Sequence, residues 1–146
     1  MHEIKDSGIV PYTAKEMFDL VADVNRYKEF LPWCQDSRVV KREKEDVVAA
    51  EIKVGYGPVH TTFATRNTHR TNQAIEMDLV EGPFEFLEGS WHFEPLPQEG
   101  CRLSLELRFE FAHSHLEAPF SQVFASAMDA LVQAFRGRAE HLYGKR

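Results

Sequence analysis

The sequence contains few of the residues that cross-link small secreted domains or bind structural metals. Its 146 residues include two cysteines, Cys34 and Cys101, with no second Cys or His at metal-ligand spacing. We therefore expect a reduced, cytoplasmic protein, because structural disulfides belong to oxidising compartments. No apolar run is long enough to span a bilayer and no secretory signal is visible, so any contact with the inner membrane would be peripheral.

Positive charge is also scarce. Seventeen Lys and Arg residues stand against twenty-three Asp and Glu residues, which gives a formal net charge of −6. Proteins that bind nucleic acid broadly rely on phosphate contacts, so this balance argues against such binding and against DNA as a partner. Repeats, linkers and low-complexity segments are missing as well, and we expect a single domain over residues 1–146.

The last part of the chain carries a long amphipathic pattern. From Leu116 to Tyr143, apolar residues recur at helical spacing within one arc of about 120°, which predicts a helix of about 40 Å. Arg138 falls at the centre of this arc. Either its side chain extends from the apolar face into solvent near the helix end, or it is a polar handle, a hydrogen-bond donor inside a cavity. The apolar residues of the arc are Leu116, Phe120, Val123, Phe124, Ala127, Leu131, Ala134, Phe135 and Leu142.

A strand before this helix provides an apolar partner for it. Between Cys101 and Phe111, apolar and polar residues alternate without a break, which predicts an antiparallel strand with one buried face and one exposed face. Upstream, Thr13 and Glu16 form a capping box that begins a helix, and a short helical turn follows over residues 23–27. Further strands are expected over residues 1–10, 37–41, 47–54, 59–67, around 75–79, and over 84–93 with a bulge near Gly89; residues 42–46 form a charged hairpin tip.

The predicted order is therefore strand, helix, helix, six strands and a long helix. About seven strands bring more apolar surface than one flat helix covers, so the sheet should curve around the C-terminal helix in an α+β fold.

Several segments resemble a known family. YKEFLPWC, TRN, LVEGPFEFLEGSW, FEPL, LRFEF and AFRGRAEHLYG, in this order and spacing, are similar to the START-like, helix-grip (SRPBCC) family of coenzyme Q-binding proteins and bacterial RatA ribosome association toxins. The resemblance covers essentially the whole chain. It implies a START/Bet v 1-like sheet that grips the last helix over an apolar tunnel.

Two functions follow from this resemblance. In the coenzyme Q branch the tunnel holds ubiquinone or a related polyprenyl quinone in support of respiration, without chemistry and without a required cofactor. In the RatA branch the protein associates with the large ribosomal subunit and blocks subunit joining and translation. The acidic net charge and the aromatic inner faces favour lipid binding as the first interpretation, with the RatA-type toxin as the alternative. Some helix-grip relatives are cyclases or aromatases, which leaves an enzyme as a third class.

The predicted ligand site is a set of large apolar side chains from the loop, the strands and the helix. The same side chains could instead interlock as a solid core, and Trp33 could pack between helix and sheet rather than form the tunnel mouth. Hydrogen-bond donors for a quinone carbonyl would come from Arg138, Arg66, His60 or the Trp33 indole. The tunnel residues are Tyr27, Phe30, Leu31, Trp33, Phe63, Met77, Phe84, Phe86, Trp91, Phe93, Phe124, Met128, Leu131 and Phe135.

Signs of catalysis and of metal binding are weak. His113 and His115 would share one face of a strand, but no third ligand accompanies them, so we expect no metal site. No grouping of Ser, His and acid indicates a nucleophile, and we expect no catalytic residues.

Ribosome binding would need basic clusters. Arg136, Lys145 and Arg146 at the helix end are the better candidate, because Glu43 and Glu45 interrupt Lys41, Arg42 and Lys44. Both clusters also fit ordinary solvated faces.

Overall fold

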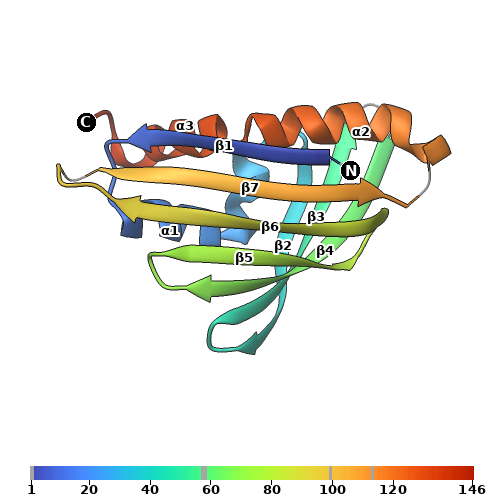
Figure 1. Ribbon diagram of the computed structural model, residues 1–146, viewed down its shortest axis with the longest axis horizontal. Coiled ribbons are helices and arrows are strands. Elements are labelled where there is room, and N and C mark those ends of the chain that lie inside the picture. The colour runs from blue at the N-terminus through green and yellow to red at the C-terminus, as the bar shows by residue number, and fades with distance from the viewer. Residues whose placement is uncertain (1, 57–58, 99, 113) are drawn as a thin grey trace.

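The protein forms one curved antiparallel sheet with helices against its inner face (Figure 1). The computed structural model describes residues 2–56, 59–98, 100–112 and 114–146, and the side chains of these residues apart from 56, 59 and 114–121. Within this part of the chain seven strands follow the spatial order β1-β7-β6-β5-β4-β3-β2. The predicted α+β fold and the order of its elements are confirmed.

The two C-terminal helices lie along the sheet. Figure 1 shows α2 and α3 end to end along the sheet, nearly parallel to β1 and β7, while β3 and β4 bend toward α2. None of the described helices is both long and apolar enough to cross a membrane. The elements are β1 (His2–Val10), α1 (Ala14–Ala22), the 3₁₀ helix η1 (Val24–Glu29), β2 (Cys34–Lys44), β3 (Val47–Tyr56), β4 (Val59–Arg70), β5 (Ala74–Glu81), β6 (Phe84–Pro95), β7 (Cys101–Phe111), α2 (Ser114–Asp129) and α3 (Leu131–Tyr143).

Strand β7 lies between β1 and β6 and provides the centre of the buried face. Its apolar residues are buried at every second position, as the alternation predicts. Leu103 and Phe109 have no exposed surface, and the Phe109 ring lies 4.8 Å from the Phe124 ring of α2. Burial of this face against the helices is the main apolar contribution to the core.

The long C-terminal helix is broken, which corrects the prediction of one continuous helix. Ala130 separates α2 from α3, and its N–H lies 3.2 Å from the carbonyls of both Ser126 and Ala127. After the break, Val132 and Ala139 are buried, whereas Leu142, which was predicted to be buried, is 49% exposed. The buried face of α3 is thus shifted by about one position. The predicted contacts of Leu116 and Phe120 lie outside the described side chains.

Two strand predictions also need correction. The register shift of β6 lies between Phe84 and Phe86 rather than at Gly89. Because the extra residue precedes Phe86, Phe84 and Leu87 both face inward and Phe86 faces outward. The β2–β3 hairpin is longer than expected, since β2 continues to Lys44 and only residues 45 and 46 form the turn. The turn predicted over residues 55–58 includes 57 and 58, which lie outside the described residues.

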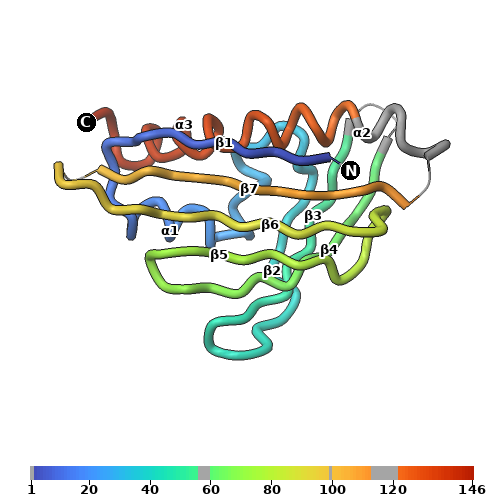
Figure 2. Tube along the Cα trace, viewed as in Figure 1, coloured from blue at the N-terminus to red at the C-terminus, as the bar shows by residue number. Residues whose placement is uncertain are grey.

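The predicted capping box is present and is extended by the C-terminus. The Thr13 hydroxyl accepts from the Glu16 N–H at 3.1 Å, and the Glu16 carboxylate accepts from the Thr13 N–H at 2.9 Å. Arg146 donates to both carboxylate oxygens at 2.6 and 2.8 Å. Figure 2 shows the chain end beside the turn between β1 and α1, where this pair joins them.

Replacing Glu16 should destabilise the protein in a pH-dependent way. The hydrogen bonds from Arg146 lower the pKa of Glu16 to about 2, so its contribution is present above about pH 4.5 and is lost as the pH falls toward 2. We expect Glu16→Gln to lower the free energy of unfolding by about 1–2 kcal/mol at pH 7. Urea unfolding at pH 7 and pH 3 should give a smaller difference at pH 3.

Glu140→Gln is the matched control, because the ion pair of its carboxylate among the described residues is with the exposed Lys145 at 3.7 Å. Equal midpoints for Glu16→Gln and the unmodified protein at pH 7 would contradict this account.

Candidate functional site

A small cavity of about 60 Å³ lies between the inner face of the sheet and the helices. A water molecule needs about 10–15 Å³ of such space, so the cavity accommodates a few waters or a small organic group. Its lining is almost entirely apolar. The lining residues are Val24, Tyr27, Leu31, Trp33, Ile52, Phe63, Thr65, Asn67, Met77, Leu87, Trp91, Leu105, Leu107, Phe124, Met128, Leu131 and Phe135.

Most of the predicted tunnel residues meet at this cavity. They come from η1 and the loop after it, from strands β4 to β6, and from both C-terminal helices. The predicted residues that line the cavity are Tyr27, Leu31, Trp33, Phe63, Met77, Trp91, Phe124, Met128, Leu131 and Phe135.

Four predicted tunnel residues lie elsewhere, which corrects the expected extent of the tunnel. Phe84 stacks on Phe111 within the core, and the outward-facing Phe86 lies under the Arg108 guanidinium at 5.6 Å. Phe30 packs edge-on against Phe135. Phe93 is the fourth.

Phe93 belongs to a cluster that closes the interior at the α1 end. Its ring contacts Phe18 of α1 at 5.6 Å, and Phe18 also contacts the His69 ring at 5.6 Å. The His69 Nε2 atom is buried and has no hydrogen-bond partner among the described residues. Side chains therefore fill this end of the predicted tunnel.

Arg138 does not line the cavity, so it is not the predicted polar handle. Its Nη2 atom donates to the Glu29 carboxylate at 2.8 Å, and its guanidinium lies 5.0 Å from the centre of the Phe30 ring. The side chain is 12% exposed, as expected for a partly covered ion pair between α3 and η1. Hydrogen bonds from Arg26 and then Arg138 lower the pKa of Glu29.

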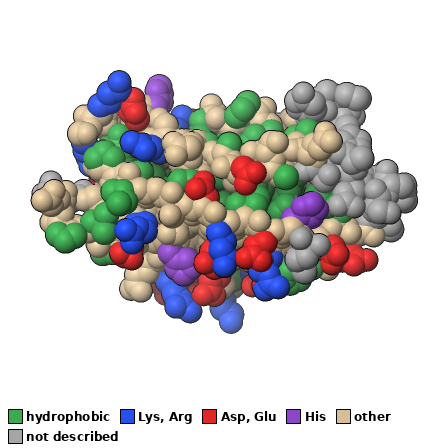
Figure 3. All heavy atoms as spheres, turned by 45° about the horizontal axis from the view of Figure 1, so that its top comes forward, with side chains coloured by type: hydrophobic (Ala, Val, Ile, Leu, Met, Phe, Trp, Pro, Cys, Tyr) green, Lys and Arg blue, Asp and Glu red, His purple; other side chains and the backbone are tan. Residues whose placement is uncertain are grey.

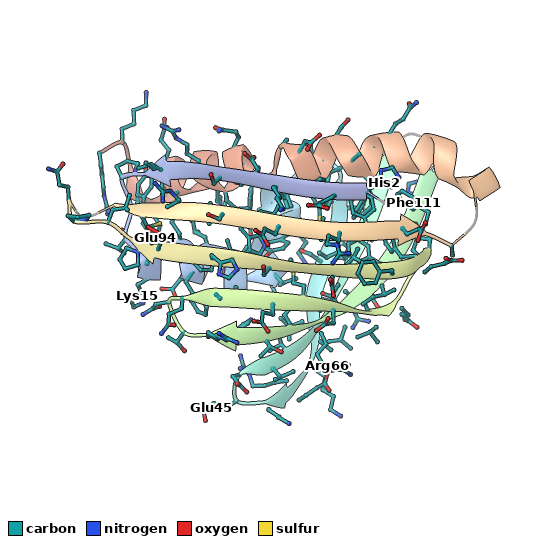
Figure 4. All side chains as sticks on the ribbon, in the orientation of Figure 1. His2, Lys15, Glu45, Arg66, Glu94 and Phe111 are labelled. Carbon is teal, nitrogen blue, oxygen red and sulfur yellow. The ribbon has the colours of Figure 1, made fainter. Side chains whose placement is uncertain are left out.

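Two more of the predicted donors, Arg66 and His60, lie on the outside of the sheet. Arg66 donates to Glu43 at 2.9 Å, and Figure 4 shows it beside the β2–β3 hairpin rather than beneath the helices. His60 is exposed and forms a hydrogen bond with Gln35 at 2.7 Å. Neither residue lines the cavity.

Thr65 and Asn67 provide polar atoms to the cavity instead. They are 5% and 6% exposed, and the Thr65 hydroxyl donates to Asn67 Oδ1 at 2.7 Å. Neither residue was predicted as part of the site, although strand alternation from the inward Phe63 places residues 65 and 67 inside and Arg66 outside. In the segment Thr65-Arg66-Asn67, the threonine and the asparagine line the cavity, whereas the arginine that was predicted as a donor does not.

The cavity lacks groups suited to acid–base chemistry. Among the described residues that line it, none is Asp, Glu, His, Lys, Arg or Cys. The Tyr27 hydroxyl donates to the Val21 carbonyl, and burial raises the pKa of this hydroxyl well above its usual range. It therefore remains protonated and hydrogen-bonded to the backbone.

An open groove of about 700 Å³ lies next to the cavity. Leu31 and Trp33 line both spaces, so these two side chains separate the cavity from the groove. The groove follows the break between α2 and α3, where Ala127, Ala130 and Ala134 present little bulk. Trp33 thus occupies the place at which a tunnel mouth was predicted.

No metal site is formed by the described side chains. The predicted pair His113 and His115 lies outside them. Cys34 and Cys101 are both buried and free, and burial raises the pKa of each thiol. These thiols are therefore poor nucleophiles at neutral pH.

Surface charges are mostly paired across neighbouring elements. Figure 3 shows acidic and basic side chains interspersed over the lower part of the visible face. At the helix end, Arg146 is bound to Glu16 and Lys145 lies 3.7 Å from Glu140, while Arg136 is exposed without a carboxylate partner among the described residues. Lys41 and Lys44 near the hairpin tip are likewise exposed and unpaired within the described part of the chain.

Comparison with known proteins places the chain in a family. Residues 10–136 match the family model described as polyketide cyclase / dehydrase and lipid transport. The chain belongs to this family.

Individual relatives carry different names. A ribosome association toxin RatA from Pseudomonas aeruginosa is 42% identical over 141 residues, which cover 97% of each chain. The mitochondrial coenzyme Q-binding protein COQ10 homolog B from Xenopus laevis is 32% identical over 98% of this chain and 60% of that protein. The crystal structure of the Zhui aromatase/cyclase from Streptomyces sp. R1128 has a TM-score of 0.83 at 18% identity, over 99% of each chain, which shows the shared fold.

The partly buried imidazole of His69 should make stability depend on pH. Burial, followed by the nearby Arg42 charge, lowers the pKa of His69, so the unfolded chain binds protons more readily than the folded protein. Stability should therefore fall as the pH drops below about 6.5, and His69→Phe should remove part of that fall. The measurement is the free energy of unfolding from pH 8 to pH 5, with the exposed His141→Phe as control. Identical slopes for the unmodified protein and His69→Phe would rule this out.

Proposed function

We propose that this protein is a RatA-type ribosome-associated toxin that binds the large ribosomal subunit and limits translation. The observation that carries the proposal is 42% identity to a RatA protein over 97% of both chains. This order reverses the first interpretation of the sequence, in which lipid binding came first.

The size of the cavity also weighs against polyprenyl quinone as the principal ligand. Pockets for drug-sized molecules usually measure about 300–1,000 Å³, whereas the cavity measures about 60 Å³. A polyprenyl chain that entered the cavity would have to displace Leu31 and Trp33 to reach the groove, or side chains such as Phe93 that fill the interior.

We infer that the β2–β3 hairpin tip carries the ribosome contact. Figure 1 shows this hairpin extending beyond the rest of the sheet, and Figure 4 shows Glu45 at its far end. Lys41 and Lys44 have no ion pair within the described part of the chain that a phosphate contact would break. The hydrogen bond that Arg42 forms there goes to the Glu45 carbonyl, at 2.8 Å. In the cluster predicted from the sequence, Arg146 would have to leave Glu16.

Binding of an apolar molecule without chemistry is the second candidate. It is supported by the relative named as a coenzyme Q-binding protein and by the enclosed cavity with two polar side chains. The lack of acid–base groups among the described lining residues argues against an enzyme, although the fold is shared with aromatase/cyclases. The two candidates use different parts of the molecule, so one does not exclude the other.

Reversing charge at the hairpin should weaken ribosome binding. We expect the unmodified protein to sediment with large subunits, and Lys41→Glu with Lys44→Glu to reduce the association constant at least about tenfold. The slope of log association constant against log salt should fall by about two, one for each lost phosphate contact. The matched control is Arg136→Glu with Lys145→Glu, which makes the same change of charge at the helix end.

The control should lose less than about threefold, because its residues lie outside the proposed contact. Equal or greater loss in the control would move the contact to the helix end. Failure of the unmodified protein to sediment with large subunits at low salt would end the ribosome proposal.

A further inference from the structure

We infer that strand β1 is a dimerisation surface, to which a second copy of this chain adds its own β1 in antiparallel orientation. This goes beyond the proposed ribosome association and does not depend on it. Figure 1 shows β1 at one edge of the sheet and the β2–β3 hairpin at the opposite side, so the two surfaces do not overlap.

The two edge strands of the sheet, β1 and β2, differ in regularity. Strand β2 has three register shifts against β3, and η1 lies along it. The Val39 N–H donates to Asn25 Oδ1 at 2.9 Å, and Lys28 Nζ donates to the Ser37 carbonyl at 3.2 Å. Strand β1, by contrast, pairs with β7 over nine residues without a shift and contains no proline. A regular edge of this kind can pair with a strand from another chain, whereas shifts and covering elements hinder such pairing.

The backbone groups of β1 that point away from β7 belong to its odd-numbered residues. The Ser7 N–H donates to the Asp6 carboxylate at 2.9 Å in an exposed hydrogen bond, so it points away from β7. Because alternate residues of an antiparallel strand direct their N–H and C=O groups to opposite sides, Glu3 and Lys5 direct theirs as Ser7 does. Among the described residues, no other backbone group forms a hydrogen bond to this side of residues 3–9. These groups are available to a further strand.

The charges of β1 are complementary to themselves when the strand is read backward. Residues 3–5 are Glu, Ile and Lys. With Ile4 on a two-fold axis, Glu3 of each copy lies opposite Lys5 of the other. In this register Glu3 and Lys5 are also the residues that exchange backbone hydrogen bonds, as the direction of their N–H and C=O groups requires. Backbone and side chains therefore favour the same arrangement.

Neighbouring registers bring like charges together on the axis. Residues that lie opposite each other must have their side chains on the same face of the sheet, so the axis passes through a residue position. An axis at Glu3 or at Asp6 would place two carboxylates opposite each other, and an axis at Lys5 would place two ammonium groups opposite each other. The axis at Ile4 avoids these contacts.

The side chains of Glu3 and Lys5 can accept this new partner at little cost. They form an ion pair at 3.4 Å within one copy, and both are exposed on the outer face of the sheet. An exposed pair of this kind contributes little to the stability of a single copy. Reversing either charge should therefore change association without unfolding the chain.

The test is sedimentation velocity of charge-reversed variants from about 10 μM to about 1 mM protein. The unmodified protein should approach twice the mass of the chain as its concentration rises. Glu3→Lys alone and Lys5→Glu alone place like charges opposite each other in both pairs, so each should raise the dissociation constant at least about tenfold. An equimolar mixture of the two variants should dimerise as the unmodified protein does, because every Glu then meets a Lys of the other copy.

The matched controls are Lys53→Glu and Glu85→Lys, which make the same charge changes at exposed positions of β3 and β6. Each should leave the dissociation constant within about twofold of the unmodified value. A monomeric unmodified protein at 1 mM would overturn the inference. Loss of the dimer in both β1 variants without recovery in their mixture would also overturn it, and so would equal losses in the controls.

Discussion

The contact between the apolar face of β7 and the two C-terminal helices is the constraint on which the rest of the structure depends. Leu103, Leu105 and Phe109 are fully or almost fully buried in this contact. Neighbouring strands must curve to place their own apolar residues against the same helices, because a flat sheet would leave them in water. The break at Ala130 allows α2 and α3 to follow the sheet separately, and the apolar groove lies beside this break.

The filling of the interior decides which functions are physically reasonable. Phe93, Phe18 and His69 close the α1 end, and Phe84 joins Phe109 and Phe124 in a separate aromatic cluster. What remains is a space for a small group with one polar side, rather than a channel for a polyprenyl chain. An interior of this kind is compatible with a surface function in translation, and its two polar side chains, Thr65 and Asn67, form a hydrogen bond with each other.

Local patterns in the sequence predicted the local structure well. Features that depend on packing between distant residues could not be predicted in the same way. The alternation of β7 and the Thr13–Glu16 capping box depend on neighbouring residues, so both could be read directly. The role of Arg138 depends on Glu29, 109 residues away. The outward position of Phe86 depends on a bulge directly after Gly82 and Pro83, and the sequence pattern indicated these two residues as a turn rather than as the start of a bulge. The inward position of Asn67 could be predicted from strand alternation. The volume of the cavity beside it could not, because it depends on how many side chains interlock.

A high-resolution crystal structure of the purified protein tests the central claim most directly, because it shows what occupies the space beneath the sheet. The account predicts a closed interior at the α1 end, with Phe93 against Phe18, and no more than a few waters or one small molecule in the cavity. A continuous tunnel holding a long lipid chain, with Phe93 separated from Phe18, would contradict it.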